Sequence, residues 1–268
     1  MGYEFGLSRR IYGVVMGVVT DNKHPDGYYR VKVKFPWIQD TKDAKDKADY
    51  VSSWARVASI MAGNGRGFYC LPEPEDEVLV SFVHGDMRYP VVIGALWNEK
   101  DKMPVGDKAP KASKDPLNND LGIDATCKDN NKLSGKNTSR FWNSRNGNTL
   151  LFDDTDGKEK VSLFTKKGHM LNINDEKDVL TLYDADKKTY LHLDAKNKKV
   201  TIFSKGDIHI LCKDGEFFVD AGTIKTQAGK TVAHKAGSTW EQKSGGVMTI
   251  KAGGNINVNA SPDINLNC

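Results

Sequence analysis

Hydrophobic positions in the last quarter of the chain recur every eight residues. Two series, set two residues apart, are mostly apolar: one is Ile208, Glu216, Ile224, Val232, Trp240, Met248, Ile256 and Ile264, and the other is Ile210, Phe218, Thr226, His234, Gln242, Ile250, Val258 and Leu266. Glycines keep step with them, at Gly206, Gly215, Gly222, Gly229, Gly237, Gly245 and Gly253. The pattern predicts short strands that alternate with glycine bends, where φ can be positive. Such a period is typical of a β-solenoid, whose repeats are stabilised by stacked neighbours or by other copies of the chain.

The first hundred residues follow a different pattern, with apolar runs separated by Gly, Pro and Asp turns. The runs predict strands at residues 12–20, 28–35, 53–60, 77–83 and 91–94. Five short strands at this spacing indicate a small antiparallel barrel, which we place at residues 11–98 after an N-terminal arm at 1–10.

The middle of the chain begins with a segment that lacks any apolar period. Residues 99–140 are rich in Pro, Gly, Asn and Lys, which predicts an extended linker. Strand patterns return over residues 141–207, at 149–152, 160–164, 170–173, 179–183, 190–193 and 200–203. We interpret this part as irregular strands that lead into the eight-residue repeat at 208–268, as one continuous solenoid. No helix of useful length is indicated, so the predicted fold class is all-β.

Composition and charge narrow the classes of function. A mean hydropathy of -0.54 and 28% charged residues suit an elongated or oligomeric β protein with much exposed surface. The 39 basic and 35 acidic residues are interspersed, with a net charge of only +4, so no basic field favours nucleic acid as a partner. The four cysteines, Cys70, Cys127, Cys212 and Cys268, form no C-x-x-C pair, so we expect free thiols and neither a metal site nor another cofactor. The sequence shows no signal peptide and no stretch of 18 apolar residues, which predicts synthesis in the cytoplasm without general export.

The barrel region carries a set of motifs in a recognisable order. They are Gly13-Val14-Val15, Asp26-Gly27-Tyr28-Tyr29-Arg30-Val31-Lys32-Val33, Ser53-Trp54-Ala55-Arg56-Val57-Ala58, Asp76-Glu77-Val78-Leu79-Val80, Gly85-Asp86, Pro90-Val91-Val92-Ile93-Gly94 and Trp97-Asn98. Together they resemble the OB-fold domain shared by phage baseplate assembly protein V, phage central spikes and the VgrG proteins of type VI secretion. Residues 148–154 and 157–163 resemble the segment by which that family enters a triple-stranded β-helix. The resemblance implies an N-terminal OB-fold barrel followed by an intertwined trimeric triple-stranded β-helix, a β-prism needle.

The same resemblance implies a function. It is that of a homotrimeric, membrane-puncturing spike at the centre of the baseplate of a contractile injection system: a phage tail, a tailocin, an extracellular injection particle or a type VI-like machine. Such a spike is assembled in the cytoplasm, delivered to or through the target cell envelope on contraction, touches the target membrane transiently and helps to deliver cargo. The sequence lacks the hub domain of VgrG proteins, so we expect a separate hub or baseplate protein at the OB end. No His-x-His pair lies near Cys268, which favours a separate PAAR-type tip protein at the C-terminal end over a metal at the tip.

In this architecture the apolar members of the eight-residue series form the trimer core. They are Ile208, Ile210, Phe218, Ile224, Val232, Trp240, Met248, Ile250, Ile256, Val258, Ile264 and Leu266. The last residues carry little charge, which favours docking of a tip protein at Asp263, Ile264, Asn265, Leu266, Asn267 and Cys268.

Polar residues interrupt the apolar series at a few positions. Glu216 is interpreted as a local register change, while Thr226, His234 and Gln242 bond across the axis or to trapped water. The alternative is that three copies of His234 bind an ion or anion on the threefold axis. A further departure is Glu75, which stands where the family has glycine, so this turn either closes differently or holds Glu75 in an unusual backbone conformation.

We expect no enzymatic activity. The carboxylates of Glu73, Glu75, Asp76 and Glu77 lie in a turn, and the glycine-rich run 63–67 lacks the residues that cradle phosphate. Two alternatives to the spike stay open. One is an OB-fold or β-solenoid module that binds glycan or oligonucleotide, with Tyr28, Tyr29 and Phe35 as its only aromatic cluster. The other is a β-solenoid enzyme that degrades polysaccharide, for which the sequence shows no acidic cleft.

Overall fold

The computed structural model describes residues 10–39, 49–104, 137–186 and 188–259, and all structural statements below concern these residues. Their regular structure consists of strands and a single 3-10 turn, Val83–Gly85, which confirms the predicted all-β class. Nowhere in these ranges is there a helix long and apolar enough to cross a membrane. The chain divides into two units, residues 1–208 and 209–268, and each is described by itself.

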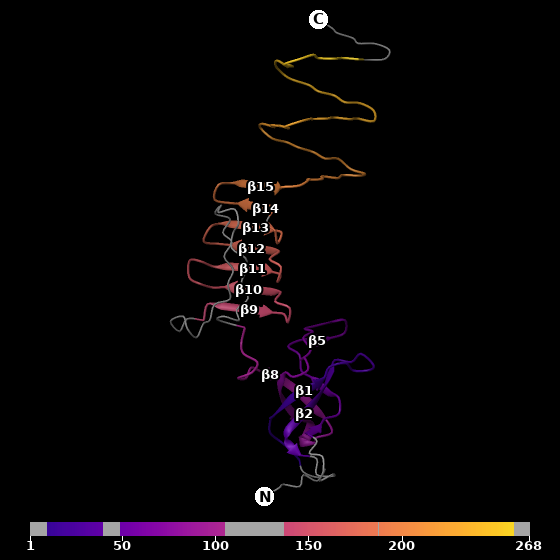
Figure 1. Ribbon diagram of the computed structural model, residues 1–268, viewed down its shortest axis with the longest axis vertical. Coiled ribbons are helices and arrows are strands. Elements are labelled where there is room, and N and C mark those ends of the chain that lie inside the picture. Colours follow the sequence, from indigo (N-terminus) through magenta and orange to yellow (C-terminus); the bar gives the residue numbers. More distant parts are fainter. Residues whose placement is uncertain (1–9, 40–48, 105–136, 187, 260–268) are drawn as a thin grey trace. The chain divides into compact units, whose positions relative to one another are not determined.

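The N-terminal strands close into a barrel. The strands are β1 (Val15–Asp21), β2 (Arg30–Gln39), β3 (Asp49–Val51), β4 (Ala55–Val57), β7 (Glu77–Phe82) and β8 (Pro90–Leu96). Their order is β1-β7-β8-β4-β2-β3, and an additional pairing of β1 with β2 closes the ring. The barrel strands are coloured from indigo to magenta in Figure 1. The β4–β8 pair is parallel and the other pairs are antiparallel. This is the OB-like barrel that the sequence predicts.

Alternation of side chains fills the barrel. On β7, Val78, Val80 and Phe82 point inward and their neighbours face out. The core consists of Val19, Val31, Val33, Phe35, Ile38, Ala55, Val78, Val80, Phe82 and Val92. Strand β1 crosses β2 so closely that a Cβ at Gly17 would lie 2.4 Å from a methyl group of Val33. Close packing of this kind leaves no room for a larger residue at position 17.

The turn before β7 holds Glu75 in the left-handed region, with a φ of 77°. The Glu75 amide donates to the Val19 carbonyl at 2.8 Å, and the Asp76 carboxylate accepts from the Glu73 amide at 2.8 Å. The turn is therefore held in place from both sides. Of the two outcomes expected for Glu75, the unusual backbone conformation is the one observed.

The glycine-rich run at residues 63–67 forms most of a short hairpin in the barrel region. Strands β5 (Ala62–Gly63) and β6 (Arg66–Gly67) pair as a short antiparallel hairpin. Gly65 turns the chain between them with a φ of 66°.

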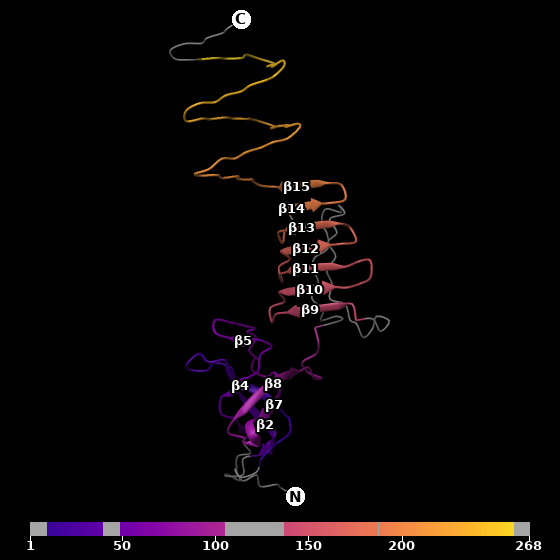
Figure 2. The same ribbon diagram turned by 180° about the vertical axis from the view of Figure 1, so that it is seen from behind.

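A second sheet follows the linker region. It contains β9 (Ser139–Asn143), β10 (Thr149–Asp153), β11 (Lys160–Phe164), β12 (Met170–Asn174), β13 (Val179–Tyr183), β14 (Thr189–Asp194) and β15 (Lys199–Ser204). Each strand pairs antiparallel with the next one along the chain, which makes the sheet a meander (Figure 2). The interpretation of this part as continuous solenoid winding is wrong, because short turns bring each strand back beside the one before it.

After β15 the chain stays extended but contains no strand up to Asn259. The trace runs in successive legs joined by bends (Figure 1). The bends lie at residues 205–206, 213–215, 222, 229–230, 237–238, 245–246 and 253–254, so all seven glycines of the series stand at a bend. None of these glycines has a left-handed φ, so the expectation of positive φ is wrong here. The period of the predicted bends is confirmed, whereas the predicted strands find no pairing partner within one chain.

Candidate functional site

One face of the β9–β15 sheet carries two columns of apolar side chains, here called the apolar columns. Cross-strand register aligns Leu150, Leu163, Leu171, Leu182, Leu191 and Ile202 in the first column, and Phe152, Val161, Ile173, Leu180, Leu193 and Val200 in the second. These side chains are partly or largely exposed in the single chain; Leu163, for example, is 52% exposed and Ile202 is 61% exposed. A contiguous apolar face of this length marks an interaction surface.

The opposite face of the same sheet is buried and has a polar central column. Asn172 donates from Nδ2 to Ser162 Oγ at 2.8 Å, and Thr181 Oγ1 is hydrogen-bonded to His192 Nδ1 at 2.8 Å. Tyr183 donates from its hydroxyl to Met170 Sδ at 2.9 Å on the neighbouring column. Hydrogen bonds satisfy most of these polar groups, although Asn172 Oδ1 has no partner among the described residues. The apolar columns on the other face have no comparable cover from described residues.

The apolar members of the eight-residue series are also exposed. Every residue from Lys205 to Asn259 is exposed, including the predicted trimer-core residues in that range; Trp240, for example, is 66% exposed. Ile264 and Leu266 lie outside the described residues. Within the described part, residues 206–259 make no backbone–backbone hydrogen bond with one another. The segment therefore has two unmet requirements, burial of its apolar side chains and partners for its backbone polar groups.

The glycines of this segment are not explained by the single chain. At Gly222, Gly229, Gly237, Gly245 and Gly253 an added Cβ would meet no heavy atom within 4 Å. Neither a left-handed φ nor a close neighbour within the chain requires glycine at these bends. The described part of the single chain therefore gives no reason for glycine at these bends.

The candidate ion ligand His234 stacks on Trp240. Their ring centroids lie 5.5 Å apart with an interplanar angle of 16°. In the ranges that the structure describes, no group of three or more His, Cys, Asp or Glu side chains could hold a metal ion. Axial ion binding by His234 stays a prediction, and the predicted tip-docking residues, Asp263 to Cys268, lie outside the described residues.

Sequence reasoning placed the trimer core after residue 207 and missed the apolar columns. The signal that identifies them is a pair of apolar residues, two positions apart, in each strand from β10 to β15, as in Leu171 and Ile173. A polar residue separates the pair in most strands, such as Asn172 in β12. This alternation predicts one apolar face for each strand, but only the register shows that the pairs of all strands lie on the same face.

The aromatic cluster predicted on the barrel does not form one surface. Phe35 is fully buried in the core, and Tyr29 packs on Tyr69 with ring centroids 5.0 Å apart. Tyr28 is exposed and lies near His24 instead, with ring centroids 5.1 Å apart. The cluster proposed for glycan or oligonucleotide binding is thus wrong in its membership.

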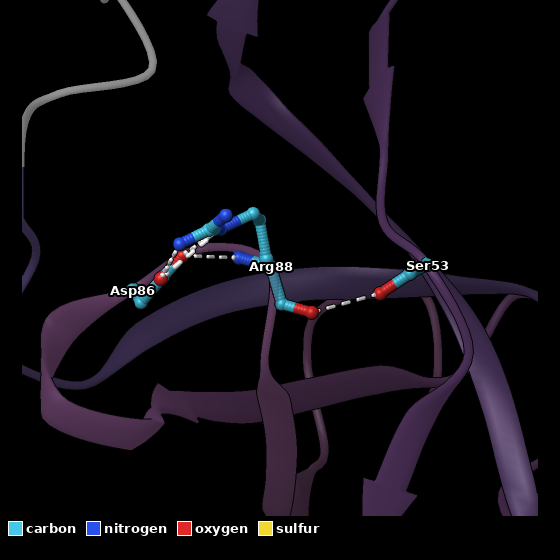
Figure 3. Close-up of polar contacts among 3 residues, drawn as sticks. All are labelled: Ser53, Asp86 and Arg88. Carbon is cyan, nitrogen blue, oxygen red and sulfur yellow. Dashed lines mark hydrogen bonds and ion pairs between the residues drawn. The ribbon is translucent and has the colours of Figure 1, made fainter.

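The loop between β7 and β8 is held by a polar cluster (Figure 3). Asp86 accepts two hydrogen bonds from Arg88 Nε, at 3.0 and 3.1 Å, one from Nη2 at 2.6 Å and one from the Arg88 amide at 3.0 Å. Ser53 Oγ donates to the Arg88 carbonyl at 3.2 Å, which ties this loop to the start of β4 (Figure 3). The hydrogen bonds from Arg88 lower the pKa of Asp86 from 3.8 to about 2. The cluster fixes a loop and offers no arrangement of acid and base for catalysis.

Comparison with known proteins identifies the barrel. Residues 15–97 match the family described as the type VI secretion system/phage-baseplate injector OB domain. The spike protein VgrG4b of Pseudomonas aeruginosa is 40% identical over 92 residues, which cover 34% of this chain and 11% of that protein. VgrG1b of the same organism is 28% identical over 165 residues, covering 61% of this chain and 19% of the relative. VgrG3 of Vibrio cholerae is 33% identical over 90 residues, covering 34% of this chain and 8% of the relative.

The chain thus spans a fifth or less of the length of these spike proteins. The part that matches the family is the closed barrel with its buried valine-rich core. Most of the motifs that carry the resemblance lie in this barrel, from Gly13 to Asn98, and the others are at residues 148–154 and 157–163. Residues 15–97 of this chain are thus an injector OB domain of the type VI secretion and phage-baseplate kind, and over this domain the chain is similar to VgrG spike proteins.

Proposed function

We propose that three copies of this chain form the central spike of the baseplate of a contractile injection system. The spike is a structural, membrane-puncturing part without catalytic activity. It is assembled in the cytoplasm and delivered to or through the target envelope on contraction. The injector OB domain and the similarity to VgrG spike proteins support this role.

The observation that carries the proposal is the state of residues 206–259. This segment is extended and exposed throughout, places mostly apolar side chains every eight residues and makes no backbone–backbone hydrogen bond within the described chain. A monomer in this state would leave a long unpaired edge in water, which is both unstable and prone to aggregation. Intertwining with two copies of itself supplies strand partners and buries the apolar series.

The apolar columns extend the same argument to the β9–β15 sheet. Three copies of the sheet, each turning its apolar columns toward a common axis, enclose one apolar interior. In the same proposal the predicted core residues from Ile208 to Leu266 are buried by pairing between chains instead of within one chain. Interchain contacts repeated at every turn must then be broken together, which suits a part that works under mechanical load.

The partners belong to the proposal as well. We infer a separate hub or baseplate protein at the barrel end and a PAAR-type tip protein on Asp263 to Cys268. The domains we propose are the arm (1–10), the OB barrel (11–98), the linker (99–140), the entry strands (141–207) and the needle with its tip (208–268).

Native mass tests the proposal directly. Light scattering of the purified chain is expected to give about three times 29.7 kDa, and the assembly is expected to survive mild detergent at room temperature. A charge placed on an apolar column, in the double variant Leu163→Asp/Leu182→Asp, is expected to abolish the trimer. The exposed turn substitution Lys167→Ala serves as the control and leaves the mass unchanged. A clean monomer of the unaltered chain at micromolar concentration would overturn the proposed spike.

A further inference from the structure

The outer surface of the barrel carries a group of aromatic and cationic side chains, here called the aromatic–cation platform. It consists of His24, Tyr28, Arg30, Lys32 and Trp54. The His24 ring lies 5.1 Å from the Tyr28 ring and 4.7 Å from the Trp54 ring, between centroids. Lys32 Nζ lies 4.9 Å from the centre of the Trp54 ring, and Arg30 Cζ lies 5.4 Å from the centre of the Tyr28 ring. Two cations are thus held on two aromatic faces, with an imidazole between the rings.

The fold positions these side chains through β2 and β4. Arg30 and Lys32 alternate with the fully buried Val31, so both face outward. Arg56 on β4 is directly opposite Arg30, which adds a third cation to the same face. The surface therefore lies on β2, on β4 and on the loop between β1 and β2.

The loop that carries His24 and Tyr28 is ordered by its own backbone. The Asp26 amide donates to His24 Nδ1 at 3.1 Å, and the Gly27 amide donates to the His24 carbonyl at 2.9 Å. Gly27 has a φ of 71°, which closes the turn. The two rings on the loop are therefore positioned before any partner arrives, which lowers the entropic cost of binding.

The cations of the platform are not neutralised within the described chain. Arg30, Lys32 and Arg56 form no ion pair with any described residue. Asp21 on β1 is opposite Lys32 in the strand register, but it accepts a hydrogen bond from the Lys23 amide and forms no ion pair with Lys32. The other acidic residue of the loop is Asp26. Cations on aromatic faces without carboxylate partners form an electropositive surface that fits an anionic group.

The chemistry of the platform selects among anionic partners. A nucleobase or sugar ring stacks on a free aromatic face, and here Arg30 and Lys32 each cover one face of Tyr28 and Trp54, which reduces the area open to stacking. Trp, Tyr and Arg are the residue types that dominate binding energy at protein–protein interfaces, and the guanidinium fork of Arg matches a carboxylate. Lys34 is the next outward-facing cation along β2, and it already interacts with another residue of the chain. Of the described cations on this face, Arg30, Lys32 and Arg56 therefore remain to pair with a partner. A short acidic segment fits this surface better than a long phosphate backbone does.

We propose that the aromatic–cation platform docks a carboxylate-bearing segment of a second protein. The platform lies on the barrel alone, so the proposal goes beyond the spike function and does not depend on the trimer. Arg30, Lys32 and Arg56 pair with carboxylates of the partner, and Tyr28 and Trp54 supply apolar contact beside these ion pairs. The charges of the aromatic–cation platform would determine which partner binds and how fast it associates.

The test uses the full chain and a fluorescein-labelled oligoglutamate peptide as the probe. Fluorescence anisotropy at low ionic strength is expected to show saturable binding that weakens as salt is added. The double variant Arg30→Ala/Lys32→Ala is expected to bind the peptide at least about tenfold more weakly, because two charge-assisted contacts are lost. The control Arg66→Ala/Lys100→Ala removes the same charge from exposed positions elsewhere in residues 49–104 and is expected to bind as the unaltered chain does.

Two further measurements keep the outcome decisive. Carbodiimide treatment of the unaltered protein with the peptide is expected to form an amide between a peptide carboxylate and Lys32 Nζ, located by mass spectrometry. Labelled oligothymidylate and a heparin oligosaccharide, measured in parallel, are expected to bind more weakly than the peptide. Absence of saturable binding, an equal loss in the control variant, absence of the Lys32 cross-link or tighter binding of either of the other probes would overturn the proposal.

Discussion

Truncation of two leucines in the apolar columns gives the most informative test of the assembly. In the single chain Leu163 is 52% exposed and Leu182 is 50% exposed, and the two belong to the same column. Full burial of a leucine side chain is worth about 1.5–3 kcal/mol, so roughly half of this, ~1 kcal/mol for each leucine, is left for the trimer interface. The variant Leu163→Ala/Leu182→Ala therefore loses ~6 kcal/mol per trimer.

This loss has a measurable size. At 1.4 kcal/mol for each factor of ten, it raises the trimer dissociation constant about 10⁴-fold. Dissociation of a trimer into three chains depends on the square of the concentration, so the concentration at half dissociation rises about a hundredfold. Sedimentation equilibrium over a dilution series measures this change, with Lys167→Ala as the control. Dissociation of the leucine variant at the same concentration as the unaltered trimer would refute the assignment of the apolar columns to the interface.

Three further predictions concern single positions. Glu75→Gly removes a non-glycine residue from a φ of 77° and is expected to raise the stability of the barrel by about 0.5–1 kcal/mol, measured by thermal denaturation; a lower melting temperature would contradict the argument. Arg88→Ala is expected to raise the pKa of Asp86 from about 2 toward 3.8 in a carboxyl titration followed by NMR. Because the folded-state pKa is lowered, the stabilising contribution of Asp86 is present above about pH 4 and is lost as the pH falls through about 2, and an unchanged titration in the variant would show that Arg88 is not the cause. At Gly229 an added side chain would meet open space within one chain, so Gly229→Val is expected to leave the thermal stability of the barrel unchanged. The same variant is expected to lower the stability of the trimer, and a trimer of unchanged stability would contradict a close approach of chains at this bend.

The sequence allowed the local structure to be predicted where side chains alternate over a core. The predicted strands at 77–83 and 91–94 correspond to β7 and β8, because each places apolar residues on one face. Glu75 could be singled out for an unusual conformation because the resembling family has glycine there, and its φ of 77° confirms this. Local pattern sufficed in these cases because one strand and one turn contain the whole signal.

Contacts between distant residues could not be predicted in the same way. The aromatic–cation platform unites His24 and Tyr28 on a loop, Lys32 on β2 and Trp54 beside β4, and nothing in the spacing of these residues indicates that they meet. Phe35 was assigned to an exposed cluster on the strength of residue type alone, although the closure of the barrel buries it. Pairing of non-adjacent strands decides which outward-facing residues become neighbours.

Local repeats of apolar residues and glycine were enough to predict the all-β class, the barrel strands other than β3 and the eight-residue period of the last quarter. The tertiary structure decided that β9 to β15 form a meander and that its apolar pairs align in two columns on one exposed face. The physical reason is register: a shift of one residue between neighbouring strands would turn every side chain to the other face, and only the paired sheet fixes that choice.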